Sequence, residues 1–563
     1  MYILGIWDGH DSGAAIVSDK RVLAAVNEER VSRRKLEVDF PEKSIKECLS
    51  LVDASPGDIK LIAVSTTDFS KTLTRIFPKL KEEYYQIRRR KKTPGFASRI
   101  KKAAKYRLTE IGSCAITRYL SEGVVRKRLR LLGFKDFSLS FYDHHYCHAA
   151  AAAFGSGFEE CAVLTLDGIG DGLSGSVSSF KNGTLRQVHS ISGKSSLGIF
   201  FEHVTNLMNM RELEDEGKVM ALATFAYPIS DNENPLIDFF RIEGIDVRAK
   251  YGVLRMYNEL KKVMWRYPSE QFAWLAQRMF ELKVTELAAN VMKATGQRNL
   301  AVAGGAFSNI KANMLIRELP VIDDLFVFPH MGDGGLALGA ACCSNYERFG
   351  VTKYDLGDIY WGPGYGDEAI LEALRKDGLH FVLHENIALI TAELVASGKI
   401  VFWVQGRMEY GPRSLGHRSI LAPADSEVVK DRLNLELKMR VWYQPFCPSI
   451  LEEDSMVCFE PFTGAPNRFM TAAFRVKPEF LDRLKGVVGK DGTCRPQVVD
   501  ARDGKYWQLL VELKRLTGLG VVLNTSLNLH GEPLVCSPED AVNTFMRTNC
   551  SYMAIGDFLV EKS

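Results

Sequence analysis

Short apolar runs separated by turns fill the first 65 residues, and this pattern restricts the fold more than any other feature of the chain. The runs "YILGIW", "AAIVS", "RVLAAVNEE" and "LIAVST" indicate strands, and the stretch from Pro41 to Val52 indicates a helix. The pattern returns at "FSLSFYD", "CAVLTLDGIGDG" and "NLAVAGGAFSN", while residues 234–296 are expected to be helical. The chain is therefore predicted to be of the α/β class.

The length of 563 residues calls for two to four domains. Glycines and a proline cluster between Tyr360 and Asp367, which indicates a linker, and a second α/β unit follows it. The composition, 46% hydrophobic and 25% charged, is typical of a soluble globular protein, and no apolar run reaches the roughly 18 residues of a membrane helix. The N-terminus lacks the pattern of a signal peptide, and the 11 scattered cysteines indicate reduced thiols, so a cytoplasmic location is expected.

Three histidines lie within five positions in "YDHHYCHAAAAAF". His144 and His148 are four residues apart and share one face of a helix, which the alanine run favours, so both imidazoles can reach one ion. His145 points about 100° away and cannot join that pair. This spacing alone is a weak metal signal, because histidines on one face are often ordinary core or surface residues.

Acidic residues at glycine turns strengthen the metal interpretation. Asp167 and Asp171 end the apolar run of "LTLDGIGDG", and Asp333 lies in the turn of "PHMGDGGLALG". Such turns present backbone N–H groups to anions, and carboxylates there serve metals and phosphates, although each aspartate could simply cap its turn. The turn "WDGHDSGAA" contributes His10, and "GGAFSN", Gly304 to Asn309, is a glycine turn that a nucleotide could approach closely.

A basic segment interrupts the first half of the chain. It holds 20 Lys and Arg against 4 Asp and Glu between Lys71 and Lys135, including "RRRKK", "RIKKAAKYR" and "RKRLR". Apolar residues recur at near-helical spacing, so parts are expected to be basic amphipathic helices. Such a surface suits a nucleic acid or an anionic membrane, with peripheral membrane attachment as one outcome; a solvated insertion that binds nothing is the alternative.

The second half gathers cations and amides near turns. Arg413 lies in "QGRMEYGPRSLGHRS", Lys438 and Arg440 in "LKMRVWYQPFCPSIL", and Arg495 in "GTCRPQVV", while "VVLNTSLNLHGEP" carries Asn524, Ser526 and Asn528. Guanidinium forks bind phosphate through two hydrogen bonds and lysine adds a point charge. A pocket for a small phosphorylated substrate competes here with surface arginines and Asx turns.

These stretches together resemble a known family, the O-carbamoyltransferases of nodulation-factor and antibiotic synthesis, of the NodU/CmcH type. The resemblance covers nearly the whole chain except the basic segment and roughly residues 230–290. The motifs, in the family's order, are "GIWDGHDSGAAIV", "NEERVSRRK", "YDHHYCHAAAAAF", "LDGIGDG", "EGKVMALA", "GGAFSN", "GDGGLALGAA", "QGRMEYGPRSLGHRSIL", "QPFCPSIL" and "LNTSLNLHGEPLVCSPEDA".

The resemblance implies two domains. Residues 1–358 would form an actin/hexokinase-like domain, a duplicated RNase H-like fold related to the tRNA threonylcarbamoyl transferase, with the basic helical insertion at about 68–135. Residues 359–563 would form a YrdC-like α/β domain that binds carbamoyl phosphate and ATP. The oligomeric state stays open, a homodimer included.

The resemblance also implies an ATP-dependent, nucleotide-binding enzyme of biosynthesis. Carbamoyl phosphate and ATP, with Mg²⁺, would give carbamoyl adenylate and pyrophosphate, and the carbamoyl group would pass to a hydroxyl acceptor on a sugar, natural product or lipid-linked compound. The implied metal is Fe²⁺, with Mn or Zn as alternatives. The implied ligands and contacts are His144, His148, Asp167 and Asp333 for the metal; Gly168, Gly170, Lys218, Gly304, Gly305 and Asn309 for the nucleotide; and Arg413, Lys438, Arg495, Asn524, Ser526 and Asn528 for carbamoyl phosphate.

Arg413 and Lys438 are also expected to take part in catalysis, and His10 is our candidate for the base that accepts the proton of the hydroxyl. The chain departs from the family where "QPFCP" places Gln444 at an expected arginine, which removes a charge from the anion pocket. Two other functions stay open: a nucleic-acid carbamoyltransferase that uses the basic segment, and a carbamoyl phosphate or nucleotide sensor without activity that docks on anionic membranes.

Overall fold

The computed structural model describes residues 1–93, 95 and 98–562, and the side chains of residues 98–103 lie outside that description. Contacts divide the chain into two compact units, each described by itself below. Unit 1 comprises residues 1–28 and 36–356, and unit 2 comprises residues 29–35 and 357–563. Helix α1 (Glu28–Ser32) begins at the last residue before the first of these boundaries. Both units mix helices and sheets, which confirms the predicted α/β class.

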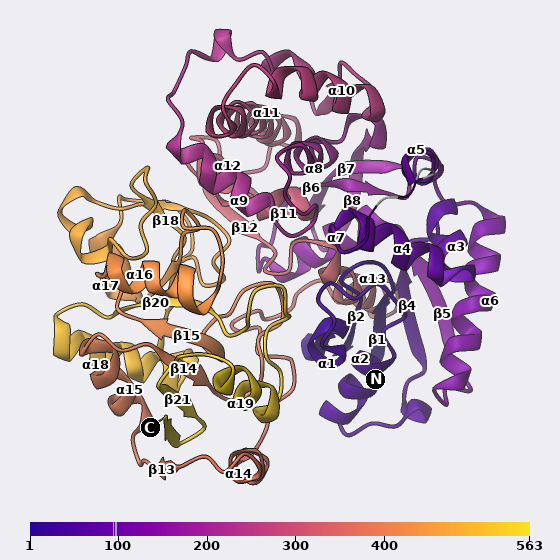
Figure 1. Ribbon diagram of the computed structural model, residues 1–563. Helices are drawn as coiled ribbons and strands as arrows, with labels where there is room; N and C mark the ends of the chain where they lie inside the picture. Colours follow the sequence, from indigo (N-terminus) through magenta and orange to yellow (C-terminus); the bar gives the residue numbers. More distant parts are fainter. Residues whose placement is uncertain (94, 96–97, 563) are drawn as a thin grey trace. The chain divides into compact units, whose positions relative to one another are not determined.

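Unit 1 contains two five-stranded sheets of the same design (Figure 1). In each, three antiparallel strands are followed by two strands parallel to the first, and the order in space is third, second, first, fourth, fifth. The first sheet holds β1 (Ile3–Trp7), β2 (Gly13–Ser18), β3 (Arg21–Asn27), β4 (Leu61–Ser65) and β5 (Ser138–Tyr142). The second holds β6 (Cys161–Gly170), β7 (Leu173–Lys181), β8 (Thr184–Ser192), β11 (Asn299–Ala303) and β12 (Asp324–Val327).

Two helices rich in small residues connect these sheets. Helix α7 (His144–Gly155) follows the last strand of the first sheet but packs on β6, β7 and β11 of the second. Helix α13 (Leu336–Phe349) follows the second sheet but packs on β1, β2 and β4 of the first, and the two helices contact each other. The five alanines after His148 are all buried, because only small side chains allow such close packing.

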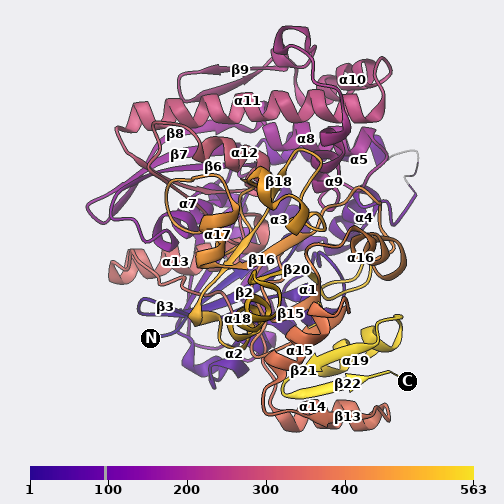
Figure 2. The same cartoon turned by 90° about the vertical axis from the view of Figure 1, so that its left-hand side faces the viewer.

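The other elements of unit 1 surround the sheets. Helix α2 (Glu42–Leu51) covers β2 and β3 at the predicted place, and the basic segment is helical as predicted. Helices α8, α10 and α11 pack together, as Figures 1 and 2 show. The bounds are α3 (Phe69–Ile76), α4 (Pro78–Arg88), α5 (Ser98–Thr109), α6 (Ala115–Leu131), α8 (Leu197–Leu207), α9 (Glu216–Leu222), α10 (Val253–Met264), α11 (Ser269–Thr295) and α12 (Ile310–Arg317).

The helical expectation for residues 234–296 is wrong over its first part. Residues 240–249 form a hairpin of β9 (Phe240–Glu243) and β10 (Asp246–Ala249), closed by a two-residue loop. Gly244 adopts a φ of 60°, which a two-residue hairpin turn requires and glycine supplies without strain. The alternating burial of β9 is the period of a strand rather than a helix.

Unit 2 is built on one eight-stranded sheet with helices on both faces. Along β14, Val401 and Trp403 face a core with α15 and α18, whereas Phe402 and Val404 face a core that includes residues of α14 and α19. The sheet order is β13 (Phe381–Leu383), β22 (Phe558–Glu561), β21 (Tyr552–Ile555), β14 (Val401–Val404), β15 (Arg418–Ala422), β20 (Val521–Ser526), β16 (Cys447–Leu451) and β19 (Gln497–Val499). The remaining elements are α14 (Asp367–Lys376), α15 (Ile387–Ala396), α16 (Glu427–Arg432), α17 (Glu452–Cys458), α18 (Lys505–Thr517), α19 (Pro538–Met546) and the pair β17 (Phe474–Arg475) and β18 (Thr493–Cys494).

Across the described residues, no helix is both long enough and apolar enough to span a bilayer.

Candidate functional site

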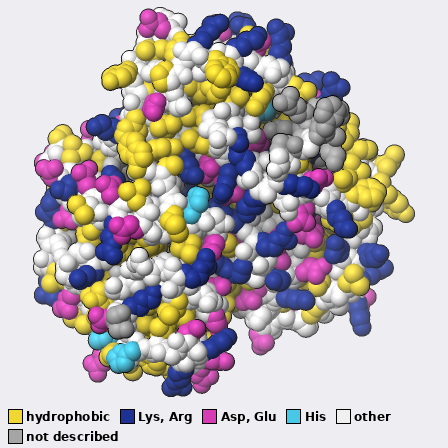
Figure 3. All heavy atoms as spheres, viewed as in Figure 1, with side chains coloured by type: hydrophobic (Ala, Val, Ile, Leu, Met, Phe, Trp, Pro, Cys, Tyr) yellow, Lys and Arg dark blue, Asp and Glu magenta, His cyan; other side chains and the backbone are white. Residues whose placement is uncertain are grey.

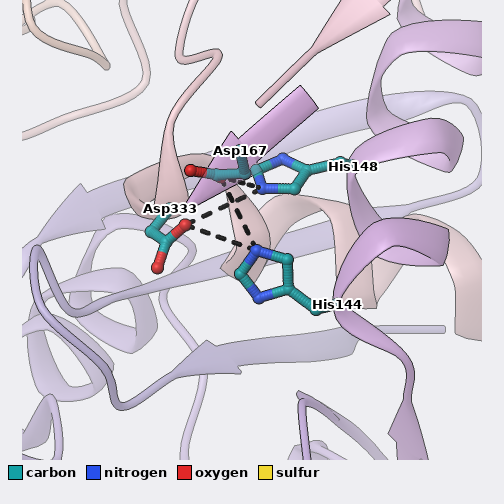
Figure 4. Close-up of side chains that lie close together, drawn as sticks. All are labelled: His144, His148, Asp167 and Asp333. Atoms are coloured by element: carbon teal, nitrogen blue, oxygen red, sulfur yellow. Dashed lines mark hydrogen bonds and ion pairs between the residues drawn. The ribbon is translucent and has the colours of Figure 1, made fainter. Parts of the chain in front are cut away.

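Four side chains of unit 1 converge on one point (Figure 4). His144 and His148 project from the first turns of α7, Asp167 lies near the end of β6, and Asp333 precedes α13. One ligand atom of each lies within 4.8 Å of the corresponding atom of the other three. The structure therefore brings together the four residues that were predicted as metal ligands.

The distances leave room for an ion among the four groups. His144 Nε2 lies 3.6 Å from Asp167 Oδ2 and 3.5 Å from Asp333 Oδ1, while His148 Nε2 lies 3.1 Å from Asp167 Oδ2 and 3.8 Å from Asp333 Oδ1. His144 Nε2 is buried and has no hydrogen-bond partner in the part of the chain that the structure describes. Two imidazoles and two carboxylates form a donor set that suits Fe, Mn or Zn, and the orphaned nitrogen fits a metal ligand.

The electrostatics of the cluster agree with this fit. Burial alone would lower the pKa of His148, but the adjacent Asp167 and Asp333 outweigh it and raise the pKa to about 9. Burial would raise the pKa of Asp167, but His144 and His148 hold it well below the usual value. Each carboxylate thus stabilises positive charge beside it, as a metal site requires.

His145 does not face the cluster. Its ring nitrogens lie 2.9 Å from Thr165 Oγ1 and 3.2 Å from Leu173 O, and burial lowers its pKa well below the usual value. It is therefore a neutral, fully bonded core residue, as its place on the helix predicted.

Backbone contacts position α7. The positive-φ residue Asp171 accepts a hydrogen bond from the backbone N–H of His144 at 2.8 Å and another from Ser113 Oγ at 2.8 Å. Asp171 thus binds the first turn of the helix and is not one of the four converging residues. Gly170 lies against the His144 ring, where an added Cβ would come within 2.3 Å of Cγ.

The contact at Gly170 gives a direct test of the geometry. Gly170→Ala should push the His144 ring away and weaken metal binding about 10- to 100-fold, the range seen when the support of a ligand is disturbed. Metal titration of the purified protein measures this. Gly217→Ala is the control, because nothing lies within 4 Å of its added methyl group; equal affinity in the two variants would contradict the assignment.

A cleft opens beside the cluster. His10 lines it, with Nδ1 at 3.4 Å from Asp333 Oδ2 and 3.2 Å from the Tyr85 hydroxyl. Burial lowers the pKa of His10 to about 4 despite the opposing effect of Asp333, so its ring is neutral at pH 7.

The glycines predicted to contact a nucleotide fall into two places. Gly168 and Gly170 line the cleft. Gly304 has a φ of 106° and lies so close to β6 that an added Cβ would meet Leu166 O at 2.1 Å, while a Cβ on Gly305 would lie 3.0 Å from Asp167 Oδ1. The second glycine turn therefore abuts the strand that carries a cluster residue.

The two side chains predicted to contact the nucleotide are already engaged. Asn309 caps α12 by accepting a hydrogen bond from Ala312 N at 3.1 Å and exchanges two hydrogen bonds with Gln277. Lys218 pairs with Asp215 at 2.7 Å. Neither residue lines the cleft described above.

Five cations among the described side chains of the basic segment are buried. The interpretation as a solvated segment is therefore wrong for Lys71, Arg75, Lys81, Arg88 and Arg89. Their partners include Asp8, Glu202, Glu212 and Glu214, all of unit 1. On the face drawn in Figure 3, Lys and Arg side chains are mixed with acidic ones, and apolar side chains gather at the edge over α3 and α6.

Asp8 anchors this segment to the first sheet. Its carboxylate lies 2.8 Å from Lys71 Nζ and accepts two hydrogen bonds from Arg75 at 2.8 and 3.0 Å, while Lys81 donates to its backbone carbonyl at 2.7 Å. Burial would raise the pKa of Asp8, but Arg75 and Lys71 bring it well below the usual value. The sequence analysis did not single out Asp8 for this role.

Unit 2 holds a group of half-buried guanidiniums. Arg413 Nε and Arg440 Nη2 are buried without a hydrogen-bond partner among the described residues, and Arg495 donates to Cys447 Sγ at 2.9 and 3.1 Å. Burial, with Arg495 nearby, lowers the pKa of Arg413 to about 9, and burial lowers that of Arg440 to about 10. Cations that repel each other and keep some N–H groups unbonded favour an anionic ligand.

The remaining predicted contacts of unit 2 lie around strand β20. The Asn524 amide accepts a hydrogen bond from the Ser414 hydroxyl and donates to the Ser414 carbonyl and the Ser449 hydroxyl. The Ser526 hydroxyl donates to Asn528 Oδ1 at 2.7 Å. Lys438 Nζ lies 2.6 Å from Ser526 O, 2.7 Å from Asn528 Oδ1 and 2.9 Å from Asn528 O. These three acceptors match the three N–H groups of the ammonium, so Lys438 ties this loop together.

Gln444 stands at the position of the expected arginine. Its backbone carbonyl accepts a hydrogen bond from Asn434 Nδ2 at 3.1 Å. The third guanidinium comes instead from Arg440, whose Cζ lies 4.2 Å from the centre of the Phe446 ring. The prediction of contact residues did not include Arg440, although its spacing from Lys438 was visible in the sequence.

Comparisons with known proteins match both halves of the chain. The family described as "Carbamoyltransferase N-terminus" matches residues 2–342, and "Carbamoyltransferase C-terminus" matches residues 392–562. The uncharacterized protein MJ1058 of Methanocaldococcus jannaschii is 36% identical over 78% of this chain and 76% of its own length. The nodulation protein NolNO of Sinorhizobium fredii is 30% identical over 98% of this chain and 79% of its own length.

Among solved structures, full-length HypF in a phosphate- and nucleotide-bound form aligns at 12% identity over 62% of this chain and 56% of that chain, with a TM-score of 0.35. The family relationship is supported by the sequence matches alone.

Proposed function

The chain belongs to the carbamoyltransferase family, and from this premise we propose that it is an ATP-dependent O-carbamoyltransferase whose donor is carbamoyl phosphate. One observation carries the proposal: the residues divide into two chemically different sites. Unit 2 offers Arg413, Arg440 and Arg495 to anions, and unit 1 offers a histidine–aspartate cluster beside a cleft. We assign activation of carbamoyl phosphate to the site in unit 2 and transfer of the carbamoyl group to the site in unit 1.

The finer fold assignments follow the same division. The repeated strand order of unit 1 supports a duplicated RNase H-like, and so actin/hexokinase-like, domain. We assign unit 2 to the YrdC-like class on the ground of its mixed sheet and its guanidinium group. We expect the enzyme to act in the cytoplasm and to use ATP as a co-substrate in the presence of Mg²⁺.

In unit 2, the guanidiniums would neutralise the phosphate groups of carbamoyl phosphate and ATP. Water releases carbamate and inorganic phosphate from carbamoyl phosphate. An oxygen of carbamate then attacks the α-phosphorus of ATP, and pyrophosphate leaves, which gives carbamoyl adenylate. Lys438 keeps Ser526 and Asn528 in place around this pocket.

In unit 1, an acceptor hydroxyl attacks the carbamoyl carbon and AMP leaves. Asp333, 3.4 Å from His10 Nδ1, favours the tautomer with the proton on that nitrogen, which leaves the lone pair of Nε2 for the proton of the hydroxyl. The metal, Fe²⁺ in our assignment, would be held by His144, His148, Asp167 and Asp333 and would supply Lewis-acid chemistry toward an oxygen of the substrate.

Pyrophosphate release tests the proposal. The purified protein should release pyrophosphate from ATP only when carbamoyl phosphate is present, and Arg413→Gln should slow this release about 100-fold, because a buried charge that meets the transition state is lost. Arg375→Gln removes an exposed arginine of unit 2 and should leave the rate unchanged. Pyrophosphate release that ignores carbamoyl phosphate would refute the proposed donor.

A further inference from the structure

The inner face of the basic segment forms one wall of the cleft in unit 1. Helices α3, α4 and α5 contribute Lys71, Tyr84, Tyr85, Arg88, Lys105 and Tyr106 to its lining. Lys105 and Tyr85 connect this wall to the metal cluster. Lys105 Nζ lies 3.4 Å from the Tyr85 hydroxyl, which lies 3.2 Å from His10 Nδ1. The wall therefore faces the place where an acceptor hydroxyl must lie.

Most cations of this wall are already neutralised. Lys71 pairs with Asp8 at 2.8 Å, and Arg88 pairs with both Glu202 and Glu212. These groups hold the wall together and have little charge left for a ligand.

Lys105 differs from them. Its ammonium lies 3.7 Å from the ring centre of Tyr84 and 4.6 Å from that of Tyr85, and no carboxylate of the described residues lies within ion-pair distance of it. Aromatic faces and one hydroxyl stabilise a cation only in part, so the remaining N–H groups favour an anion that enters the cleft.

The shape of the wall indicates the rest of the ligand. Trp7, Tyr84, Tyr85 and Tyr106 all line the cleft, so a ligand there meets aromatic side chains as well as the Lys105 ammonium. Lys105 and His10 contact the same Tyr85 hydroxyl from two sides. The Lys105 ammonium and the His10 ring therefore lie within reach of one ligand of sugar size.

We propose that Lys105 binds an anionic group, a carboxylate or a phosphate, on a sugar-sized acceptor whose hydroxyl lies at His10. The inference rests on the proposed function, because it gives the chemical class of the acceptor for the transfer step. It makes Lys105 a residue that determines acceptor specificity and gives the inner face of the basic segment a specific ligand.

The charge of Lys105 depends on pH in the physiological range. Burial and the nearby Arg88 lower the pKa of Lys105 to about 7. Since only the ammonium attracts an anion, binding should be strongest below that pKa and weaken as the pH rises through it. The charged and titratable groups that face Lys105 are Asp68, Lys71, Tyr84, Tyr85, Arg88, Glu202 and His10.

Calorimetric binding of three probes to the full chain tests this inference without turnover. D-glucuronate and glucose 6-phosphate should bind at pH 6.5 at least about tenfold more tightly than D-glucose, as expected for one charge-assisted contact. The tighter of the two charged probes tells carboxylate from phosphate. Lys105→Met should remove the preference for charge, whereas Lys127→Met, an exposed cation of α6, should keep it.

A charge-preserving variant separates charge from structure. Lys105→Arg stays cationic to high pH, so it should keep the preference at pH 9, where the natural protein loses it. The unit 2 arginines also attract anions, so the decisive comparison is the natural protein against Lys105→Met. A preference that survives in Lys105→Met, or that the natural protein lacks, would overturn the inference. Pyrophosphate release that depends on carbamoyl phosphate is measured in a separate experiment. A failure of the proposed function would therefore be distinguished from a failure of the Lys105 inference.

Discussion

Replacing His148 with alanine should lower the metal affinity of the protein by more than about 100-fold and stop carbamoyl transfer. The variant loses one of four converging ligands, and Asp167 Oδ2 loses its contact with His148 Nε2 at 3.1 Å. Loss of a direct ligand exceeds the 10- to 100-fold effect of disturbing a residue behind one. Metal content after dialysis, measured by elemental analysis, gives the readout.

His189→Ala is the matched control for His148. His189 lies on β8, pairs with Asp246 at 3.2 Å and has no part in the cluster. Its variant should retain the metal of the natural protein. A His148→Ala protein that binds metal as well as His189→Ala does would remove His148 from the site, and with it the four-ligand assignment.

Replacing Asp8 with asparagine should destabilise unit 1 by about 3–5 kcal/mol, the cost of removing one partner of a buried ion pair. Lys71 and Arg75 would stay buried without their carboxylate, and their side chains are only 7% and 2% exposed. The basic segment should then detach from the first sheet. Urea unfolding followed by circular dichroism, together with limited proteolysis of residues 69–131, measures both effects.

Asp323→Asn supplies the comparison for Asp8. Asp323 also pairs with an arginine, Arg298, but both side chains are 57% exposed. Water already solvates these two groups, so the unfolding midpoint should stay where it is. If the two aspartate variants unfold at the same urea concentration, Asp8 does not anchor the segment.

The helix and the turns that carry the candidate metal ligands could be predicted, because the local sequence pattern determines them. The four-residue spacing of His144 and His148 places both on one helix face, and glycine turns after apolar runs placed Asp167 and Asp333 at the edges of strands and helices. Local pattern could not predict that the four side chains converge, because it does not connect α7 to residues far along the chain. That expectation was implied by the resemblance to the carbamoyltransferases.

The inward charges of the basic segment could not be predicted. Lys71 faces the interior because it pairs with Asp8, which follows a strand far away in the sequence, whereas Lys127 is exposed. The composition of the segment does not distinguish these two lysines. The β9–β10 hairpin, in contrast, could have been found from its alternation around Gly244. The long apolar periodicity of α11 that follows obscured it.

The crossed packing of α7 and α13 has a consequence for the metal cluster. Each sheet is completed by the helix that belongs, in sequence, to the other, in the manner of a domain swap within one chain. His144, His148 and Asp167 therefore belong to the half of the second sheet, because α7 packs on β6, whereas Asp333 stands before α13, which packs on the first sheet. The four residues thus join the two halves of unit 1, and an ion that bound all four would connect one half to the other.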